Sequence, residues 1–256
     1  MYSFAILRKA RLVVALISIL ISLPMTAFGR PSGGSEVDAD HLSAPDAGVA
    51  RGSARVLPST ASLGGKTYGE WVASFWQWAL ALPVDGHPFS ECMRNFSAGQ
   101  SGNVWYWSAP DGPVTCKEKI PAGKAILLTM RDVEASSLEE PPFYGATEAE
   151  QRRAAQWFAD HIIDVFCLID GVPVQKIANF RFVTRQFVFS APTPWIFGAV
   201  GGSGTALADG YYVLVPPLPK GKHMIHYGGA FRFVAGELGP DPLEFRKDVV
   251  LELTVE

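Results

Sequence analysis

The fold is decided by the stretch Ala208-Asp-Gly-Tyr-Tyr-Val-Leu-Val-Pro-Pro-Leu-Pro-Lys-Gly-Lys-His223. Its segment Tyr211 to Val215 is apolar at odd and even positions alike. A strand with that pattern is buried on both faces, so we predict a central strand of a covered sheet. The residues Leu218 to Gly221 then place Pro second and Gly fourth, which is typical of a type I turn. Ile120-Pro-Ala-Gly123 repeats this pattern, and both turns are predicted to join hairpin strands.

Further strands are indicated by short runs of apolar and aromatic residues. We predict strands over Asn103 to Ser108 and over Lys124 to Arg131. In Val249 to Glu256 apolar residues alternate with Glu and Thr, which indicates a strand with one face in water. From Phe180 to Phe189 the aromatic parity switches. A single change of register near Thr184 to Gln186 would keep all four phenylalanines on one side.

Two helices are predicted from apolar residues that recur every three or four positions. The first covers Tyr68 to Leu82 and ends at Pro83. The second covers the run Arg152 to Val165, after a capping box formed by Thr147 and Glu150. The apolar face of each helix is expected to pack on a sheet.

Composition agrees with a chain rich in turns and strands. The 256 residues include 25 glycines and 19 prolines, and only 18% of the residues are charged. This balance argues against a coiled coil and against a wholly disordered chain. We therefore predict a mainly β protein, an antiparallel, jelly-roll-like β-sandwich with two packed α-helices. A single domain is expected over residues 66–256.

The first 29 residues have the features of a secretory signal peptide. Arg8, Lys9 and Arg11 precede the apolar run Leu12 to Leu23, which is shorter than a membrane-spanning helix. Ala27-Phe-Gly29 offers the small side chains that signal peptidase requires. We predict cleavage after residue 29, with an uncleaved anchor as the alternative. The mature protein would be periplasmic or secreted and would have no membrane span.

Residues 30–65 are rich in Gly, Ser, Ala, Pro and Asp and contain no aromatic residue, which indicates a disordered linker. The signal segment carries three basic and no acidic residues, so its removal changes the formal net charge from −3 to −6. An acidic chain repels phosphate backbones, and nucleic-acid binding is therefore not expected.

Cysteine usage agrees with export to an oxidising compartment. Cys92 and Cys116 flank an irregular, Gly-rich segment, and we predict a disulfide between them. Cys167 lies in the apolar run Val165 to Ile169 and is predicted to be a buried, inert thiol.

The first candidate site is aromatic. Trp105 and Trp107 share one face of a predicted strand and follow the polar loop that contains Gln100. Exposed aromatic rings stack on sugars while neighbouring polar groups bind hydroxyls. We therefore name Trp105, Trp107, Gln100 and Trp78 as candidate binding residues, Trp78 because it lies at the margin of the first helix's apolar stripe. The competing interpretation is that both faces of the strand are buried between sheet and helices.

The second candidate site is a metal centre built from His87, Glu91, His223 and His226. Imidazole and carboxylate groups bind divalent transition metals, and such an ion would support hydrolase or lyase chemistry. Because side chains alternate along a strand, His223 and His226 should point to opposite faces, which argues against a shared ion. A divalent transition metal is expected only if the protein is such an enzyme. A non-catalytic binding or structural protein, the leading hypothesis, would need no cofactor.

The motifs Tyr-Gly-Glu-Trp at 68–71, Phe-Trp-Gln-Trp at 75–78, Gly-Gln-Ser-Gly at 99–102 and the stretch 208–223 together resemble secreted bacterial proteins of unknown function that carry a signal peptide. The resemblance implies export and no particular activity. The leading hypothesis is an exported, non-catalytic binding or structural protein for a glycan or another cell-envelope component. The alternative is a periplasmic metal-assisted hydrolase or lyase that uses His87, His223 and His226.

Overall fold

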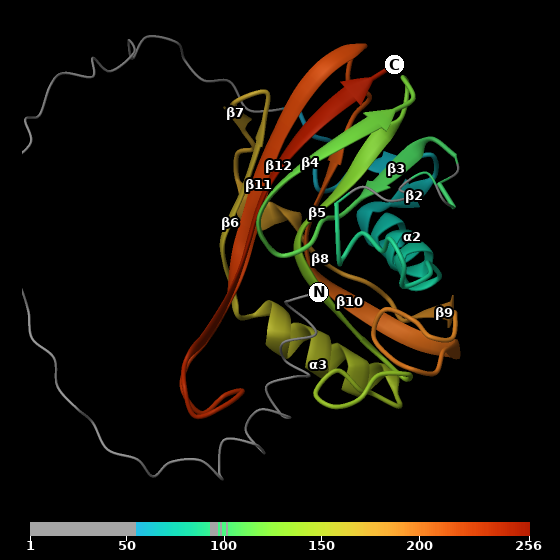
Figure 1. Cartoon of the computed structure of the whole chain (residues 1–256), viewed down its shortest axis with the longest axis vertical. Coiled ribbons are helices and arrows are strands. Elements are labelled where there is room, and N and C mark those ends of the chain that lie inside the picture. Colours follow the sequence, from blue (N-terminus) through green and yellow to red (C-terminus); the bar gives the residue numbers. More distant parts are fainter. Residues whose placement is uncertain (1–54, 93–96, 98, 101) are drawn as a thin grey trace, which may run out of the picture.

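Two five-stranded β-sheets lie face to face in the computed structural model, which describes residues 55–92, 97, 99–100 and 102–256 (Figure 1). A separate two-stranded ribbon, β1 (Ser62–Leu63) with β2 (Lys66–Thr67), precedes the first helix. Buried residues of both large sheets belong to one hydrophobic cluster. The described part of the chain is therefore mainly β and sandwich-like, as predicted.

The inner sheet has the strand order β3-β5-β10-β8, and β9 pairs with another part of β10. Its strands are β3 (Val104–Trp107), β5 (Ala125–Ser136), β8 (Arg181–Val183), β9 (Phe187–Ala191) and β10 (Gly202–Val215). Tyr212, Val213 and Leu214 of β10 are all buried. This burial at odd and even positions confirms the central, doubly covered strand.

The outer sheet has the strand order β4-β12-β11-β6-β7. Its strands are β4 (Gly112–Ile120), β6 (Ile162–Ile169), β7 (Val172–Pro173), β11 (Gly221–Phe233) and β12 (Leu243–Val255). Val249, Leu251, Leu253 and Val255 of β12 are buried, whereas the residues between them are less so, as the alternation predicted. In Figure 1 both helices and the inner sheet lie on the same side of the outer sheet. None of the other described helices or strands of the two layers covers the opposite side, which we call the open face.

Two strand pairs depart from the antiparallel pattern. β3 pairs with β5 in parallel, and β4 pairs with β12 in parallel. Parallel neighbours need a crossover connection. Here β4 is that crossover, because the chain leaves the inner sheet after β3, forms an edge of the outer sheet and returns as β5.

Both Pro-Gly segments connect one sheet to the other. Residues 120–123 join β4 of the outer sheet to β5 of the inner sheet, and residues 218–221 join β10 to β11. Gly123 has a φ of 84°, a conformation that favours glycine. The prediction that these segments join hairpin strands is wrong. Which strands pair depends on how the two sheets pack, and a local turn pattern carries no information about that packing.

Helix α2 (Tyr68–Leu80) begins at the N-cap Thr67, which forms a capping box with Glu70. The predicted helix over residues 68–82 is therefore confirmed, apart from its last two residues. Among the described residues, neither helix has the length and apolar character needed to cross a membrane.

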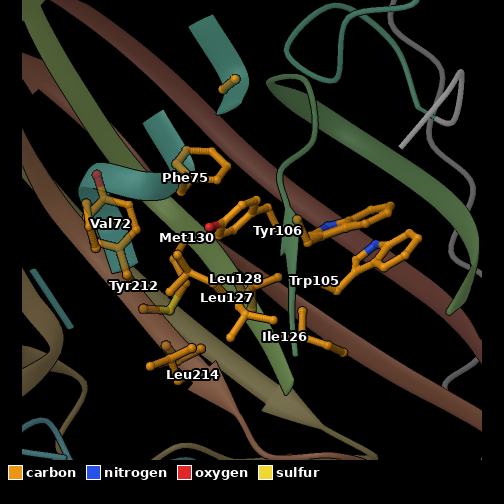
Figure 2. Close-up of a cluster of buried hydrophobic side chains, with 14 of the residues drawn as sticks. Val72, Phe75, Trp105, Tyr106, Ile126, Leu127, Leu128, Met130, Tyr212 and Leu214 are labelled. Atoms are coloured by element: carbon orange, nitrogen blue, oxygen red, sulfur yellow. The ribbon is translucent and has the colours of Figure 1, made fainter. Parts of the chain in front are cut away.

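Aromatic side chains of α2 pack on the face of the inner sheet that is turned away from the outer sheet. Phe75 meets Tyr106 edge to face with ring centroids 6.0 Å apart, and Val72 and Tyr212 lie beside them (Figure 2). The indole N–H of Trp76 donates a hydrogen bond of 3.0 Å to the hydroxyl of Tyr212. The inner sheet is thus covered on both sides.

Helix α3 (Glu148–Ala159) begins at the predicted capping box but ends earlier than predicted. Residues Ile162–Ile169 form strand β6, which pairs with β11. The predicted helix over 152–165 is therefore wrong beyond residue 159. β-branched residues dominate the start of this segment and favour a strand, and the edge of β11 supplies the backbone partners.

The aromatic run from Phe180 to Phe189 forms two short strands that meet different parts of β10, with residues 184–186 between them. The register pairs Phe182 with Gly210, Phe187 with Ala206 and Phe189 with Gly204. These partners are all even-numbered residues of β10, so three phenylalanines share one face of the inner sheet. Phe180 ends the 3-10 helix η1 (Ile177–Phe180) and lies against Tyr68. The predicted change of register is confirmed as a break between β8 and β9.

Ordered packing begins before the predicted domain boundary at residue 66. The backbone N–H of Leu57 donates to Leu214 O of β10, and its carbonyl accepts a hydrogen bond from the hydroxyl of Tyr68. Of the predicted linker, residues 30–54 lie outside the described residues, as does the predicted signal segment 1–29.

Candidate functional site

A groove of about 840 Å³ lies at one end of the outer sheet, where β4, β12 and β11 are neighbours. It is lined by Lys117, Glu118, Lys119, Asp170, Lys222, His223, Met224, Glu252, Leu253 and Thr254. The more exposed side chains of each strand occupy alternate positions and therefore stand on the open face. The volume lies in the range of known ligand sites, and we call this feature the β4–β12–β11 groove.

Strand register orders the exposed side chains of the groove into two rows. The first row is Lys117, Glu252 and Met224, and the second row is Lys119, Thr254 and Lys222. Residues directly opposite each other on neighbouring strands have their side chains on the same face, about 5 Å apart. Each row therefore places three side chains across about 10 Å of sheet.

Ion pairs neutralise most of the charge in the groove. Lys117 Nζ lies 3.2 Å from Glu252 Oε2, and Lys119 Nζ lies 3.1 Å from Glu256 Oε2. The structure gives Lys222 no ion pair with any described residue. The second row thus carries one ammonium group that forms no ion pair with a described carboxylate.

Glu118 is a titratable group of the groove. Burial raises the pKa of its carboxyl to about 7, against the opposing effect of a hydrogen bond donated by the backbone N–H of Lys119. That bond joins Lys119 N to Glu118 Oε1 over 2.9 Å. The carboxyl therefore changes charge near neutral pH, and the net charge of the groove becomes more negative as the pH rises through 7.

His223 lies at the groove with both ring nitrogens facing acceptors. Its Nδ1 is 2.8 Å from Asp170 Oδ2, and its Nε2 is 2.9 Å from Pro219 O. Burial disfavours the charged ring, but the bonds with Asp170 and Pro219 outweigh it and raise the pKa of His223. A ring that donates from both nitrogens has no lone pair left for a metal ion.

The other predicted ligands lie elsewhere. His226 projects from the open face, with its Nε2 2.7 Å from Asp248 Oδ1 and its ring edge-on to Phe166. His87 is buried beside α2, where its Nε2 donates to Ala79 O at 3.0 Å and its Nδ1 accepts from the backbone N–H of Phe89 at 3.1 Å. Burial lowers the pKa of His87 to about 4, so the ring is neutral.

These positions do not bring the predicted metal ligands together. Glu91 is close to His87, because its backbone N–H donates to His87 O at 3.2 Å. His223 and His226, however, belong to β11 of the outer sheet and stand at positions of opposite parity. Among the described residues, no group of three or more His, Cys, Asp or Glu side chains is placed to hold a metal ion.

The predicted aromatic site is also buried. Trp105 and Trp107 are only 7% and 1% exposed. Trp107 donates from its indole N–H to the hydroxyl of Tyr227 in the outer sheet at 2.8 Å, and Figure 2 shows Trp105 and Tyr106 on opposite sides of β3. The two indole rings fill the space between the sheets and offer no face to a sugar. Their burial agrees with the competing interpretation, in which both faces of this strand are buried.

Gln100 and Trp78 both contact Tyr106, Gln100 at its backbone and Trp78 at its ring. The Gln100 amide donates to Tyr106 O at 2.9 Å and accepts from Tyr106 N at 3.0 Å, as a neighbouring strand would. It thereby caps the edge of the inner sheet. Trp78 is buried with its ring 5.5 Å from that of Tyr106, and a Cβ at Gly99 would lie 3.1 Å from Trp78. Both predicted binding residues therefore have structural partners.

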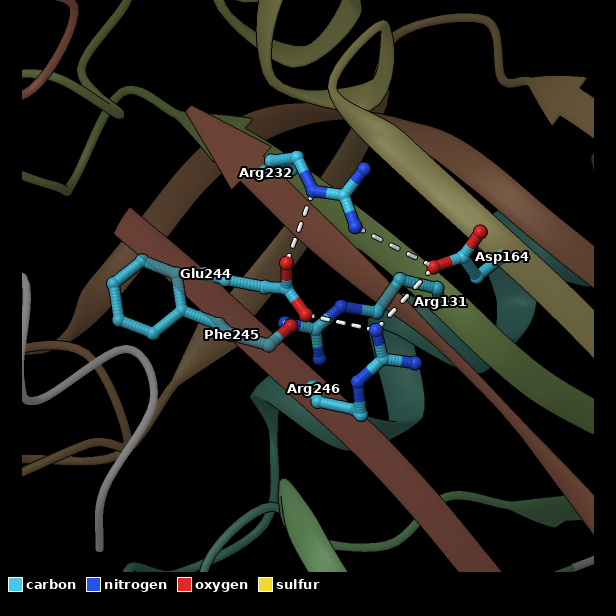
Figure 3. A network of polar contacts seen from close by, with 6 residues as sticks. All are labelled: Arg131, Asp164, Arg232, Glu244, Phe245 and Arg246. Carbon is cyan, nitrogen blue, oxygen red and sulfur yellow. Dashed lines mark hydrogen bonds and ion pairs between the residues drawn. The ribbon is translucent and has the colours of Figure 1, made fainter. Parts of the chain in front are cut away.

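A second polar cluster lies on the open face beyond the groove. Arg232 and Arg246 each contact Glu244 and Asp164, with the closest approach 2.8 Å between Arg246 Nη2 and Glu244 Oε1 (Figure 3). Two cations and two anions cancel, and all four side chains are solvent-accessible, so the network contributes little to stability. Its charges are satisfied internally, which leaves the groove as the better candidate for a ligand.

Comparison of the chain with protein-family models, curated proteins and solved structures finds no match. The geometry of the groove is therefore the basis for the function proposed below. One signal in the sequence pointed toward it, because Glu252 and Thr254 belong to the predicted wet face of β12. The other two strands of the groove could not be assigned as neighbours from their own patterns.

Proposed function

We propose that the chain is exported to the periplasm or secreted, and that it binds a glycan or another envelope component without catalysing a reaction. The β4–β12–β11 groove is the observation that carries the proposal. There, exposed side chains of three strands surround a ligand-sized volume.

The chemistry of the groove suits a sugar. Met224 is 48% exposed and offers an apolar contact, while lysine, glutamate and threonine side chains stand beside it. A sugar ring presents C–H surfaces together with hydroxyls that both donate and accept hydrogen bonds. Such a ligand pairs with a mixed lining better than a wholly apolar molecule would.

The disulfide supports the exported location. Cys92 and Cys116 are bonded, at a sequence separation of 24. Such bonds persist mainly in oxidising compartments, so the structure is compatible with a place outside the cytoplasm. The alternative function, a metal-assisted hydrolase or lyase, gains no support, since His87, His223 and His226 are separated and hydrogen-bonded.

Binding is tested with an array of bacterial envelope glycans followed by calorimetric titration of each hit. We expect Met224→Ala to weaken binding. The matched control is Val234→Ala, because Val234 is also exposed but lies beyond the other end of β11. No binding to any envelope glycan, or equal losses in the two variants, would reject the groove as the site.

Export is tested separately by N-terminal sequencing of the protein recovered outside the cytoplasm. We expect the mature chain to begin at Arg30. A chain that still begins at Met1 would contradict cleavage of a signal peptide.

A further inference from the structure

The exposed ammonium group of Lys222, which forms no ion pair with a described residue, points to the class of glycan. Across the second row, Thr254 stands directly opposite Lys119 on one side and Lys222 on the other. The two lysines are therefore about 10 Å apart with a hydroxyl between them. Glu256 neutralises Lys119, whereas Lys222 is exposed and forms no ion pair with a described residue.

The hydroxyl of Thr254 is a second available group. Thr254 is half-buried, and its hydroxyl makes no hydrogen bond with a described residue. An ammonium and a hydroxyl that flank one spot can both donate to the same anionic oxygen, and charge-assisted bonds are the stronger ones. The neighbouring first row supplies Met224 on the same side of the sheet, where a sugar ring would lie.

Resting on the proposed function, we infer that the groove selects an acidic glycan whose carboxylate or phosphate group lies against Thr254 and Lys222. Lys222 is the residue that sets this specificity. A neutral glycan would leave the Lys222 charge unmatched and would gain only the contacts of the first row. An acidic glycan neutralises it, as Glu252 and Glu256 neutralise the other two lysines.

The experiment uses three oligosaccharides of equal length: one built from uronic acids, its carboxyl-reduced neutral counterpart and a phosphorylated neutral one. Affinity for the exported protein is measured by calorimetry at low and high salt. We expect the two acidic probes to bind about tenfold more tightly than the neutral one, with a preference that shrinks as salt increases. The relative affinities of the two acidic probes tell carboxylate from phosphate.

Two variants that each remove one lysine charge distinguish a direct contact of Lys222 with the acidic group from the general effect of the protein's net charge. Lys222→Ala should abolish the preference for acidic probes, while Lys220→Ala removes the same charge from a residue that does not line the groove. Thr254→Val should lower the affinity for the acidic probes by a few-fold. Melting temperatures show whether the variants fold. We expect them to fold, because the substituted side chains are exposed or half-buried.

Three results would overturn the inference, and they differ in what they leave standing. Equal affinity for neutral and acidic probes, or equal losses in the two lysine variants, would remove the acidic specificity. Neutral binding that Met224→Ala still weakens would then preserve the proposed function. Failure of all three probes to bind would reject the groove as a glycan site altogether.

Discussion

Trp76 and Tyr212 are joined by a hydrogen bond of 3.0 Å between the indole N–H and the phenol oxygen, although 136 positions separate them in the sequence. The hydroxyl of Tyr212 in turn donates to the carboxyl of Asp132 on β5. One buried chain of polar groups thus ties helix α2 to two neighbouring strands of the inner sheet.

Removal of the central hydroxyl should destabilise the fold. Tyr212→Phe keeps the packing of the ring but leaves the Trp76 N–H and the Asp132 carboxyl without this partner. We expect a loss of about 1–3 kcal/mol in the free energy of unfolding, measured by urea denaturation. Tyr144→Phe is the control, because Tyr144 is 47% exposed. Equal effects of the two substitutions would contradict the role of the buried chain.

Asp132 should make stability fall as the pH rises. Burial raises the pKa of its carboxyl to about 6, and its Oδ2 is buried without a hydrogen-bond partner among the described residues. The neutral acid is favoured in the folded state, so this stability is present below about pH 4 and is lost as the pH rises through 6. The loss attributable to Asp132 should reach about 3 kcal/mol.

The measurement is the difference in unfolding free energy between the native chain and Asp132→Asn from pH 4 to pH 8. An amide carries no charge, so the variant should gain relative stability across this interval. A difference that stays flat with pH would show that Asp132 does not titrate in the folded protein near 6.

His87 should act in the opposite direction. Burial lowers its pKa to about 4, below the ordinary value of 6.5, and the neutral ring bridges Ala79 O and the Phe89 N–H. The associated stability is present above pH 6.5 and is lost as the pH falls through 4, by about 3 kcal/mol in total. We expect the NMR signal of this ring to titrate near pH 4. A midpoint near 6.5 would contradict its burial.

The disulfide should be the one cystine of the described chain. Non-reducing peptide mapping should recover a Cys92–Cys116 peptide, and replacing both residues by serine should cost about 3 kcal/mol of stability. Burial raises the pKa of the Cys167 thiol to about 12, so it should react with a thiol reagent only after unfolding. Any disulfide peptide that contains Cys167 would contradict this assignment.

Local patterns in the sequence determined several elements directly. The capping box at Thr147 and Glu150 marked the start of α3, and the doubly apolar run 211–215 marked a central strand. These features depend on neighbours along the chain, through hydrogen bonds within a helical turn or through the two faces of one strand. The pairing of Cys92 with Cys116 was also predictable, because the third cysteine lay in an apolar strand.

The tertiary structure alone decided which elements meet. Trp105 and Trp107 had the composition of a binding site, but the outer sheet covers both rings, and only the folded arrangement shows this. The same holds for the groove, whose second row joins Lys119, Thr254 and Lys222 from three segments far apart in the sequence. Strand partners are selected by the burial of whole sheet faces against each other. The free energy of burying these faces depends on the assembled layers, so it cannot be predicted from the pattern of any single segment.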